Sequence, residues 1–520
     1  MTDAAPAPDR PNIVFFMVDQ LSAKWIEGDS AAACPTPKLD RLRADGVTFT
    51  RAITSNPLCL PARSTLATGL TTRGHGVLAN GYRLDPALWT FMRALQGAGW
   101  RTGAFGKVHL QPHYMGAHAD YRPYGFDVVC NTEDTRAGEW LDWVRDNHPA
   151  HYDAALAVVP DLHIPELRAY GLDRIDLVER IRPRREAFRW TPTGRPYPYY
   201  DLPFPSEVSQ TGWITACALD FLRAADPARP LYAHVSTVQP HSPFTPPREF
   251  LEQIDGARIP APVPPEWAED PRRPTCFETS EDARKTIPHN WREYRTYYLA
   301  SVAHLDHQLG RVIEAVTAAG RWENTYLLFL ADHGELLMDH GFSGKGERHY
   351  DASIRVPLIV AGPGVAAGRT VDAFVQLEDV CPTVLEMAGL PAPAAPTIGP
   401  YLREEPRTLA GRSLMPWLRG ETPGGWRDAA YVESYNNIGS AKPLHWARTV
   451  RTSRWRYTLY PGGHGEQLFD LDADPDETQN LAFDPAFAGV RTEMRDRLLE
   501  AVVLQDYPHT PRGLFAHGAH

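Results

Sequence analysis

Residues 59–69 read Cys-Leu-Pro-Ala-Arg-Ser-Thr-Leu-Ala-Thr-Gly and follow the turn-forming residues Thr-Ser-Asn-Pro at 54–57. Proline is tolerated in the first turn of a helix because its missing N–H has no intrahelical acceptor there, so the sequence predicts that Cys59 begins a helix. Backbone N–H groups and the positive end of the helix dipole favour an anion at such a position. Arg63 lies one turn further along the same face, where its guanidinium can bind an oxyanion with two hydrogen bonds. We therefore predict an anion site at Cys59 and Arg63; a buried structural cysteine is the alternative.

The chain has 520 residues, which is enough for one large domain and a smaller one. Apolar residues make up 43% and charged residues 22%, as in ordinary globular proteins. The formal net charge is −11, and the sequence contains no run of lysines and arginines. Both features argue against nucleic acid or an anionic membrane as a partner.

The cysteines and the N-terminus bear on the cellular compartment. Six cysteines are scattered without a Cys-x-x-Cys pair, which disfavours a zinc ribbon. Residues 1–11 are polar and carry no apolar signal-peptide core, and no apolar run is long enough to span a bilayer. We therefore expect a cytoplasmic protein without a membrane partner.

Two apolar runs, 12–18 and 326–331, are predicted to be strands buried on both faces of a parallel sheet. Four polar residues follow them directly: Asp19, Gln20, Asp332 and His333. Open α/β sheets bind ligands at the carboxyl ends of their strands, and these side chains offer carboxylate, amide and imidazole ligands to a divalent metal. The imidazole favours Mn²⁺ or Zn²⁺, and Ca²⁺, which prefers oxygen, is the alternative. For Asp19 taken alone, a role in starting a turn is an equally good interpretation.

Further candidate residues follow predicted strands elsewhere in the chain. They are Lys107, His109 and His241. Lys107 and His109 are two residues apart, so their side chains face the same side if this segment stays extended. A lone lysine or histidine is more often a solvated surface residue, but this pair directly after a glycine favours a site.

Several motifs, taken in order, resemble those of the formylglycine-dependent sulfatases, a family of the alkaline phosphatase superfamily. They are Cys59-x-Pro61-x-Arg63, Gly106-Lys107-x-His109, Pro240-His241-x-Pro243-Phe244, and Leu468-Phe469-Asp470-Leu471 with Asp474-Pro475 and Asn480-Leu481. The matches extend from Asn12 to about Ala482. The resemblance implies an α/β fold in which helices sandwich a large, mostly parallel sheet, with a smaller C-terminal antiparallel-sheet subdomain.

On this basis we expect a catalytic domain at 1–400 and a C-terminal α+β subdomain with a tail at 401–520. Residues 131–205 are rich in aromatic residues, prolines and arginines. We interpret them as an inserted, lid-like segment that packs over the site and shapes the substrate pocket. An aromatic packing layer is the alternative.

The resemblance also implies how the nucleophile is made. In the family, a formylglycine-generating enzyme oxidises the cysteine that corresponds to Cys59 to an aldehyde. The aldehyde hydrate attacks sulfur and forms a covalent hemiacetal sulfate, while Arg63 and the metal hold it in place. Residue 59, as formylglycine, thus joins Asp19, Gln20, Asp332 and His333 at the metal.

The remaining roles are likewise implied by the resemblance. Lys107 and Lys345 neutralise charge on the transferred group, and His241, with Lys345, assists the leaving oxygen. His109 then takes the proton of the second hydroxyl, so that sulfate leaves and the aldehyde is regenerated.

Two departures from the family pattern leave the substrate open. Most members supply three aspartates and one asparagine to the metal, whereas this chain has Gln20 and His333. A subgroup that includes phosphonate monoester hydrolases shares this pair and is associated with manganese, but it usually lacks the Lys107-x-His109 pattern. Hydrolysis of small sulfate monoesters is therefore the first interpretation. A phosphonate monoester or phosphodiester hydrolase, with Asn80 as a further substrate contact, is the second. A non-catalytic binding protein is the third, and the number of subunits stays open, with a homo-oligomer among the options.

Overall fold

The computed structural model describes residues 10–113, 117–159, 165–187, 198–224, 226, 228–279, 284–393, 409–436 and 445–505. The domain boundary predicted at 400 lies outside the described residues. The same holds for residues 160–164 and 188–197 of the predicted insertion.

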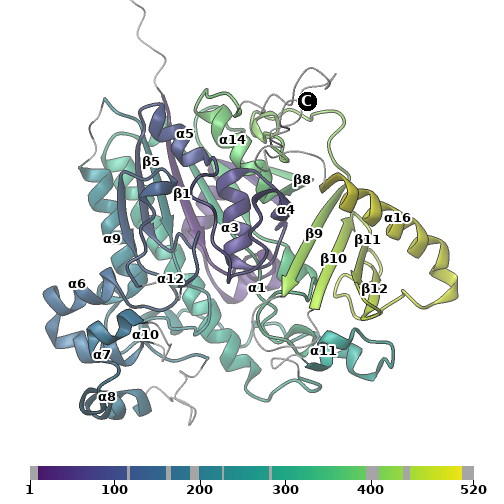
Figure 1. The fold of residues 1–520 in the computed structure, drawn as a ribbon, viewed down its shortest axis with the longest axis horizontal. Coiled ribbons are helices and arrows are strands. Elements are labelled where there is room, and N and C mark those ends of the chain that lie inside the picture. The colour runs from purple at the N-terminus through teal and green to yellow at the C-terminus, as the bar shows by residue number, and fades with distance from the viewer. Residues whose placement is uncertain are drawn as a thin grey trace, which may run out of the picture.

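An eight-stranded sheet forms the centre of the molecule (Figure 1). In spatial order its strands are β4 (Val128–Asn131), β3 (Arg101–Gly106), β5 (Leu231–Ser236), β1 (Asn12–Val18), β6 (Thr325–Ala331), β7 (Leu358–Ala361), β2 (Gly46–Ile53) and β8 (Arg369–Gln376). Strand β7 runs antiparallel to both of its neighbours, and the other pairs are parallel. The predicted large, mostly parallel sheet is confirmed.

Strands β1 and β6 are neighbours in the middle of this sheet. Every residue of both strands is buried, as expected for strands covered on both faces. Val18 pairs with Ala331 at the last position of each strand. Asp19 and Asp332 therefore leave the sheet side by side, although 312 residues separate one strand end from the other in sequence.

The same alignment brings Lys107 to this edge. Ser236, the last residue of β5, pairs with Met17 of β1 on one side and with Gly106 of β3 on the other. Because the strands are parallel, the residue that follows Gly106 emerges at the edge that carries Asp19.

Helices pack in two layers. In one layer α12 (Trp291–Ala318) contacts both α2 (Pro37–Asp45) and α9 (Gln210–Arg223); in the other, α3 (Cys59–Thr68), α5 (Phe91–Gly97) and α14 (Val380–Met387) contact one another. Figure 1 shows α3 and α5 in front of β1. The shorter helices are α1 (Gly28–Ala33), α4 (Thr72–His75), α10 (Arg248–Leu251), α11 (Thr275–Thr279), α13 (Asp351–Ile354) and α15 (Met415–Leu418).

A second, antiparallel sheet lies at the right of Figure 1. Its order is β12 (Gly465–Asp470), β11 (Trp455–Tyr460), β10 (His445–Thr452) and β9 (Ala429–Asn436). Helix α16 (Ala488–Gln505) packs on it through an apolar cluster of its own, which includes Tyr457, Leu468, Met494 and Leu498. The predicted smaller antiparallel subdomain is confirmed.

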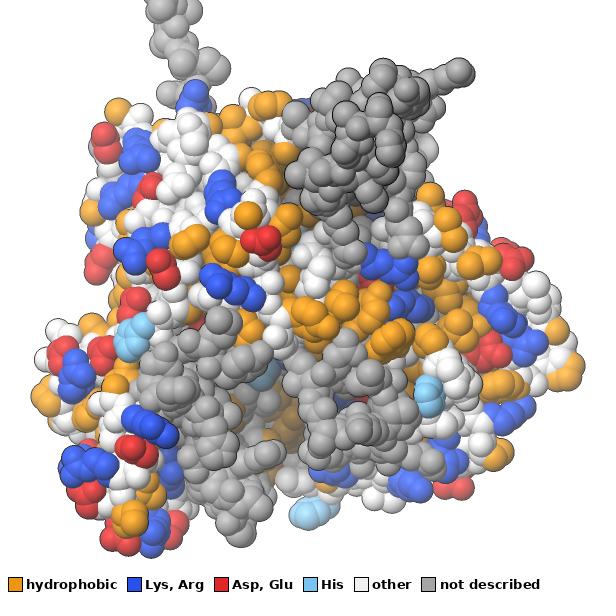
Figure 2. All heavy atoms as spheres, in the orientation of Figure 1, with side chains coloured by type: hydrophobic (Ala, Val, Ile, Leu, Met, Phe, Trp, Pro, Cys, Tyr) orange, Lys and Arg blue, Asp and Glu red, His pale blue; other side chains and the backbone are white. Residues whose placement is uncertain are grey.

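Within 131–205, helices α6 (Glu139–Asn147), α7 (Tyr152–Ala157) and α8 (Ile175–Ala187) contact one another in sequence order. They lie at the lower left of Figure 1. On the face shown in Figure 2, acidic and basic side chains are interspersed in this region. Among the described residues, none of the helices combines the length and apolar character needed to cross a bilayer.

Candidate active site

Cys59 is the first residue of α3 and follows Leu58 in an extended conformation, so the predicted helix start is confirmed. Asn80 Oδ1 accepts a hydrogen bond from the backbone N–H of Leu60 at 3.0 Å, which satisfies one of the donors at the helix N-terminus. Asn80 therefore holds this terminus in place beside residue 59. The whole of α3 is buried, and it ends at Gly69, whose φ of +67° suits glycine.

Four potential metal ligands meet at the carboxyl ends of β1 and β6. One donor atom from each of Asp19, Cys59, Asp332 and His333 lies within 4.8 Å of the others, and all four residues are buried. His333 Nε2 is 3.1 Å from Cys59 Sγ and 3.6 Å from Asp19 Oδ1. Burial lowers the pKa of His333 to about 3, so its ring is neutral and keeps a lone pair for a metal. This donor set fits one divalent cation.

Gln20 lies next to this cluster with its amide held in one orientation. Its backbone N–H donates to Asp332 Oδ1 at 3.0 Å. Its side-chain N–H group donates to Glu335, and its amide oxygen accepts from Lys345. Glu335 also accepts two backbone N–H groups of the loop that follows, at 2.9 and 2.6 Å. Glu335 is a residue that our sequence analysis missed, although it comes two residues after His333.

Arg63 is almost fully buried and is fixed by several acceptors. Its Nε donates to Asp332 Oδ2 at 2.8 Å, and its Nη1 donates to the Lys107 carbonyl at 2.7 Å and to Ser236 Oγ at 3.0 Å. Among the described residues its Nη2 has no hydrogen-bond partner, and it lies 3.8 Å from Asp19 Oδ2. Arg63 thus keeps one donor group for an incoming oxyanion.

Two lysines lie near Cys59. Lys345 Nζ donates to Cys59 Sγ at 3.2 Å. Lys107 Nζ is fully buried, pairs with Asp19, and lies 2.7 and 2.8 Å from the two carboxylate oxygens of Asp134. Burial opposes the charge of Lys107, but Asp134 and Asp19 hold its pKa well above the usual value, so this lysine is a cation.

His241 is partly buried in the turn after β5. Its Nδ1 lies 2.7 Å from the Ser242 carbonyl. A carbonyl can only accept, so Nδ1 carries the proton and Nε2 keeps the lone pair. Burial, followed by the charge of Lys345, lowers the pKa of His241 to about 4, while Asp134 and Asp19 act in the opposite direction. His241 therefore belongs to the same group of interacting charges as the two lysines.

Comparison with known proteins accounts for this arrangement. Residues 11–390 match the profile of the sulfatase family, and residues 339–503 match the profile of the C-terminal region of N-sulphoglucosamine sulphohydrolase. The chain belongs to the sulfatase family. The first match covers more than half of the chain and includes every candidate site residue described above.

Individual relatives of this sulfatase agree with that assignment. An arylsulfatase of Clostridium perfringens is 27% identical over 91% of this chain and 90% of its own length. The multifunctional alkaline phosphatase superfamily protein PehA of Trinickia caryophylli is 27% identical over 97% of this chain and 99% of its own length. Among solved structures, the phosphonate monoester hydrolase of Agrobacterium radiobacter has a TM-score of 0.74 and 26% identity, with 95% of this chain and 96% of that chain covered. The chain thus matches sulfatases of the alkaline phosphatase superfamily over most of its length, and the family implies a divalent metal and a formylglycine.

The expectation that Lys107 and His109 face the same side of an extended segment is wrong. Strand β3 ends at Gly106, and His109 has a φ of +48°. The cause is Glu133, whose Oε1 accepts the backbone N–H groups of Val108 and His109 at 3.3 and 3.0 Å and turns the chain away from the strand direction. His109 is fully buried in this sulfatase, and among the described residues neither of its ring nitrogens has a hydrogen-bond partner.

Three further residues near the site were not among our candidates: His113, Glu133 and Asp134. Glu133 and Asp134 follow β4 and its terminal residue Asn131 by two and three positions. They lie at the start of the segment 131–205 that the sequence predicts to be an insertion. The strand-end argument that identified Asp19 and Asp332 applies to them as well, and it could have found them. His113 carries no comparable sequence signal.

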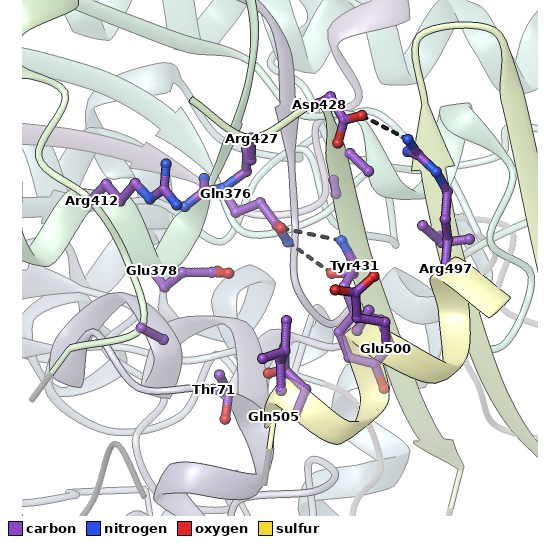
Figure 3. A pocket seen from close by; sticks show the side chains of 16 residues that line it. Thr71, Gln376, Glu378, Arg412, Arg427, Asp428, Tyr431, Arg497, Glu500 and Gln505 are labelled. Atoms are coloured by element: carbon purple, nitrogen blue, oxygen red, sulfur yellow. Dashed lines mark hydrogen bonds and ion pairs between the residues drawn. The ribbon is translucent and has the colours of Figure 1, made fainter. Parts of the chain in front are cut away.

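A cavity elsewhere in the protein is distinct from this site. A cavity of about 710 Å³ lies between α16 and the end of β8. Figure 3 shows Gln376 reaching the backbone of Tyr431 with two hydrogen bonds, of 2.8 and 3.2 Å, and Asp428 pairing with Arg497. Its lining residues include none of the candidate site residues, so this cavity is separate from the candidate active site.

Proposed function

We propose that this sulfatase hydrolyses sulfate monoesters of the arylsulfatase type, with residue 59 as a formylglycine nucleophile. One observation carries the proposal. Cys59 begins a buried helix and lies among Asp19, Asp332 and His333, with Lys345 at 3.2 Å. Burial, followed by the charge of Asp19, raises the pKa of the Cys59 thiol to about 11. An unmodified thiol with such a pKa is a poor nucleophile at neutral pH, which supports conversion of the side chain to the aldehyde.

The first half-reaction transfers the sulfuryl group to residue 59. Water adds to the aldehyde, one hydroxyl of the hydrate attacks sulfur, and the bond between sulfur and the ester oxygen breaks. Arg63 Nη2 is the free donor for an oxygen of the sulfate group. The attacking hydroxyl loses a proton and the oxygen of the departing alcohol gains one. We assign this transfer to His241, whose Nε2 lone pair takes up the proton and passes it on, with Lys345 beside it. A divalent cation held by Asp19, Asp332, His333 and residue 59, with the Gln20 amide oxygen beside them, would supply further stabilisation of negative charge.

The second half-reaction releases sulfate by elimination. His109 takes the proton of the second hydroxyl, the bond from carbon to the sulfate oxygen breaks, and the aldehyde is regenerated. The unpartnered ring nitrogens of His109 support this assignment, because a neutral imidazole with a free lone pair can accept that proton. Burial, followed by the charges of His113 and Lys107, lowers the pKa of His109 well below its usual value.

A phosphonate monoester or phosphodiester hydrolase is the second candidate. The observation that favours it is the likeness over nearly the whole chain to the phosphonate monoester hydrolase of Agrobacterium radiobacter, together with Gln20 and His333. The test compares kcat/KM for a nitrophenyl sulfate and a phenylphosphonate ester on one preparation. We expect the sulfate to be the better substrate. A higher kcat/KM for the phosphonate ester would favour the second candidate, and no turnover of either would favour a binding protein.

The two histidines should separate the two half-reactions. In His109→Ala we expect a burst of one equivalent of alcohol, little further turnover, and a sulfated residue 59 that mass spectrometry detects. In His241→Ala we expect a slower burst, most of all with poor leaving groups, because a nitrophenyl group needs less protonation. A burst and adduct in His241→Ala, and neither in His109→Ala, would show that the two roles are reversed.

A further inference from the structure

A second group of metal-type side chains lies beside the active site. It consists of His109 and His113, on the segment after β3, and Glu133, after β4. One donor atom from each of the three residues lies within 4.8 Å of the others. The two imidazole rings are stacked, with their centroids 3.8 Å apart.

In the described part of the chain, four potential ligand atoms of this group lack a hydrogen-bond partner. Within the described residues, no hydrogen-bond partner is present for either ring nitrogen of His109, for His113 Nδ1 or for Glu133 Oε2. The other oxygen of Glu133, Oε1, accepts from the backbone of Val108 and His109 and from the Tyr121 hydroxyl at 2.7 Å. Buried polar atoms are normally paired, because an unpaired one loses its hydration without compensation. Several unpaired donors that converge on one point therefore indicate a ligand between them.

The surroundings of His113 match those of a metal-bound histidine. Its Nδ1 is 3.8 Å from Glu133 Oε2, and its Nε2 is 2.8 Å from Asp134 Oδ2. A histidine that binds a metal through one ring nitrogen usually presents the other to a carboxylate, which fixes its tautomer and orientation. Asp134 is in the position of that carboxylate, and it also pairs with Lys107.

We propose that His109, His113 and Glu133 bind a divalent transition-metal cation of the zinc class. Two imidazoles and one carboxylate are a ligand set that Zn²⁺ accepts, with a fourth position open to water. Zn–N bonds are about 2.0–2.1 Å long, so the three side chains draw together when the ion binds. This site shares no ligand with the cluster of Asp19, Cys59, Asp332 and His333.

If residue 59 is sulfated as in the proposed function, on which this step rests, the second ion should inhibit turnover. A cation on His109 occupies the lone pair with which His109 would accept the hydroxyl proton. The second ion therefore stalls the elimination of sulfate, as His109→Ala does. Zinc bound here is an inhibitor of the sulfatase and leaves residue 59 sulfated.

The site is tested first by counting ions, without reference to activity. The intact protein is loaded with Zn²⁺, desalted and analysed for metal, and its zinc affinity is measured by calorimetry. We expect two ions per chain for the unsubstituted protein and one for His113→Ala, His113→Gln and Glu133→Gln. His118→Ala is the matched control, because His118 is an exposed histidine nearby that pairs with Asp142, and it should retain two ions.

The outcome that overturns the site is a count of one ion in the unsubstituted protein, or two ions in all three variants. His113 is about one-fifth exposed, so its substitution is not expected to unfold the chain, and circular dichroism of His113→Gln checks this. The inhibitory step is tested by titrating turnover with Zn²⁺. At zinc concentrations that fill the second site, we expect turnover to fall at least tenfold in the unsubstituted protein and in His118→Ala. Turnover of His113→Ala should not fall in this way.

The two proposals fail in different ways. Zinc bound to the second site without loss of turnover overturns the inhibitory step. Absence of sulfate-ester hydrolysis in every preparation overturns the proposed function. The ion count decides the second site in either case.

Discussion

Cys59→Ala is expected to lower sulfate-ester turnover by at least about 10⁴-fold, because removing the nucleophile of a covalent mechanism removes the chemical step itself. The loss follows from the position of Cys59 at the start of α3, where Lys345 and His333 lie within 3.2 Å of its sulfur. No neighbouring side chain can supply a hydrate with two hydroxyls on one carbon. Turnover of a nitrophenyl sulfate under substrate excess is the measurement.

Cys34→Ala is the matched control, because Cys34 is equally buried but packs near Leu299 of α12, outside the site. It should keep its activity. Mass spectrometry of the peptide that contains residue 59 should show the aldehyde, and activity among preparations should scale with the converted fraction. A fully active preparation in which this peptide carries only the thiol would refute the nucleophile that we propose.

The double substitution Asp19→Ala with Asp332→Ala should remove one divalent ion per chain and lower turnover by about 10³-fold or more, since a catalytic metal contributes several kcal/mol to transition-state stabilisation. The two carboxylates lie at the ends of the paired central strands β1 and β6. Both carboxylates also contact Arg63. Their removal therefore also disturbs the position of the Arg63 guanidinium, the proposed donor to the sulfate oxygen. Metal analysis and turnover are measured on the same samples.

Asp306→Asn is the control for this pair, because Asp306 is a buried carboxylate that caps α2 through Leu39 and Lys38 and lies outside the metal cluster. It should keep both the ion and the activity. An unchanged metal content in the double variant would place the ion elsewhere. After metal removal, Mn²⁺ or Zn²⁺ should restore more turnover than Ca²⁺, because His333 offers nitrogen.

Local sequence determined the parts of this site that depend on strand ends and helix starts. The apolar runs before Asp19 and Asp332 predicted two buried strands, and the structure pairs them in register. The proline after Cys59 predicted the start of α3. Such features depend on a few neighbouring residues and on the rule that parallel strands end at one edge of a sheet. This is why the core of the site and the fold could be predicted without coordinates.

Tertiary structure alone decided the surroundings of Lys107 and His109. Their sequence predicted an extended pair, but Glu133, 24 residues beyond His109, binds the backbone there and reverses the sign of φ. Asp134 pairs with Lys107 because β4 is hydrogen-bonded to β3, which places the residues after Asn131 at the same edge of the sheet. The direction of a side chain beyond the end of a strand is set by hydrogen bonds to distant segments. Local sequence periodicity does not predict those bonds.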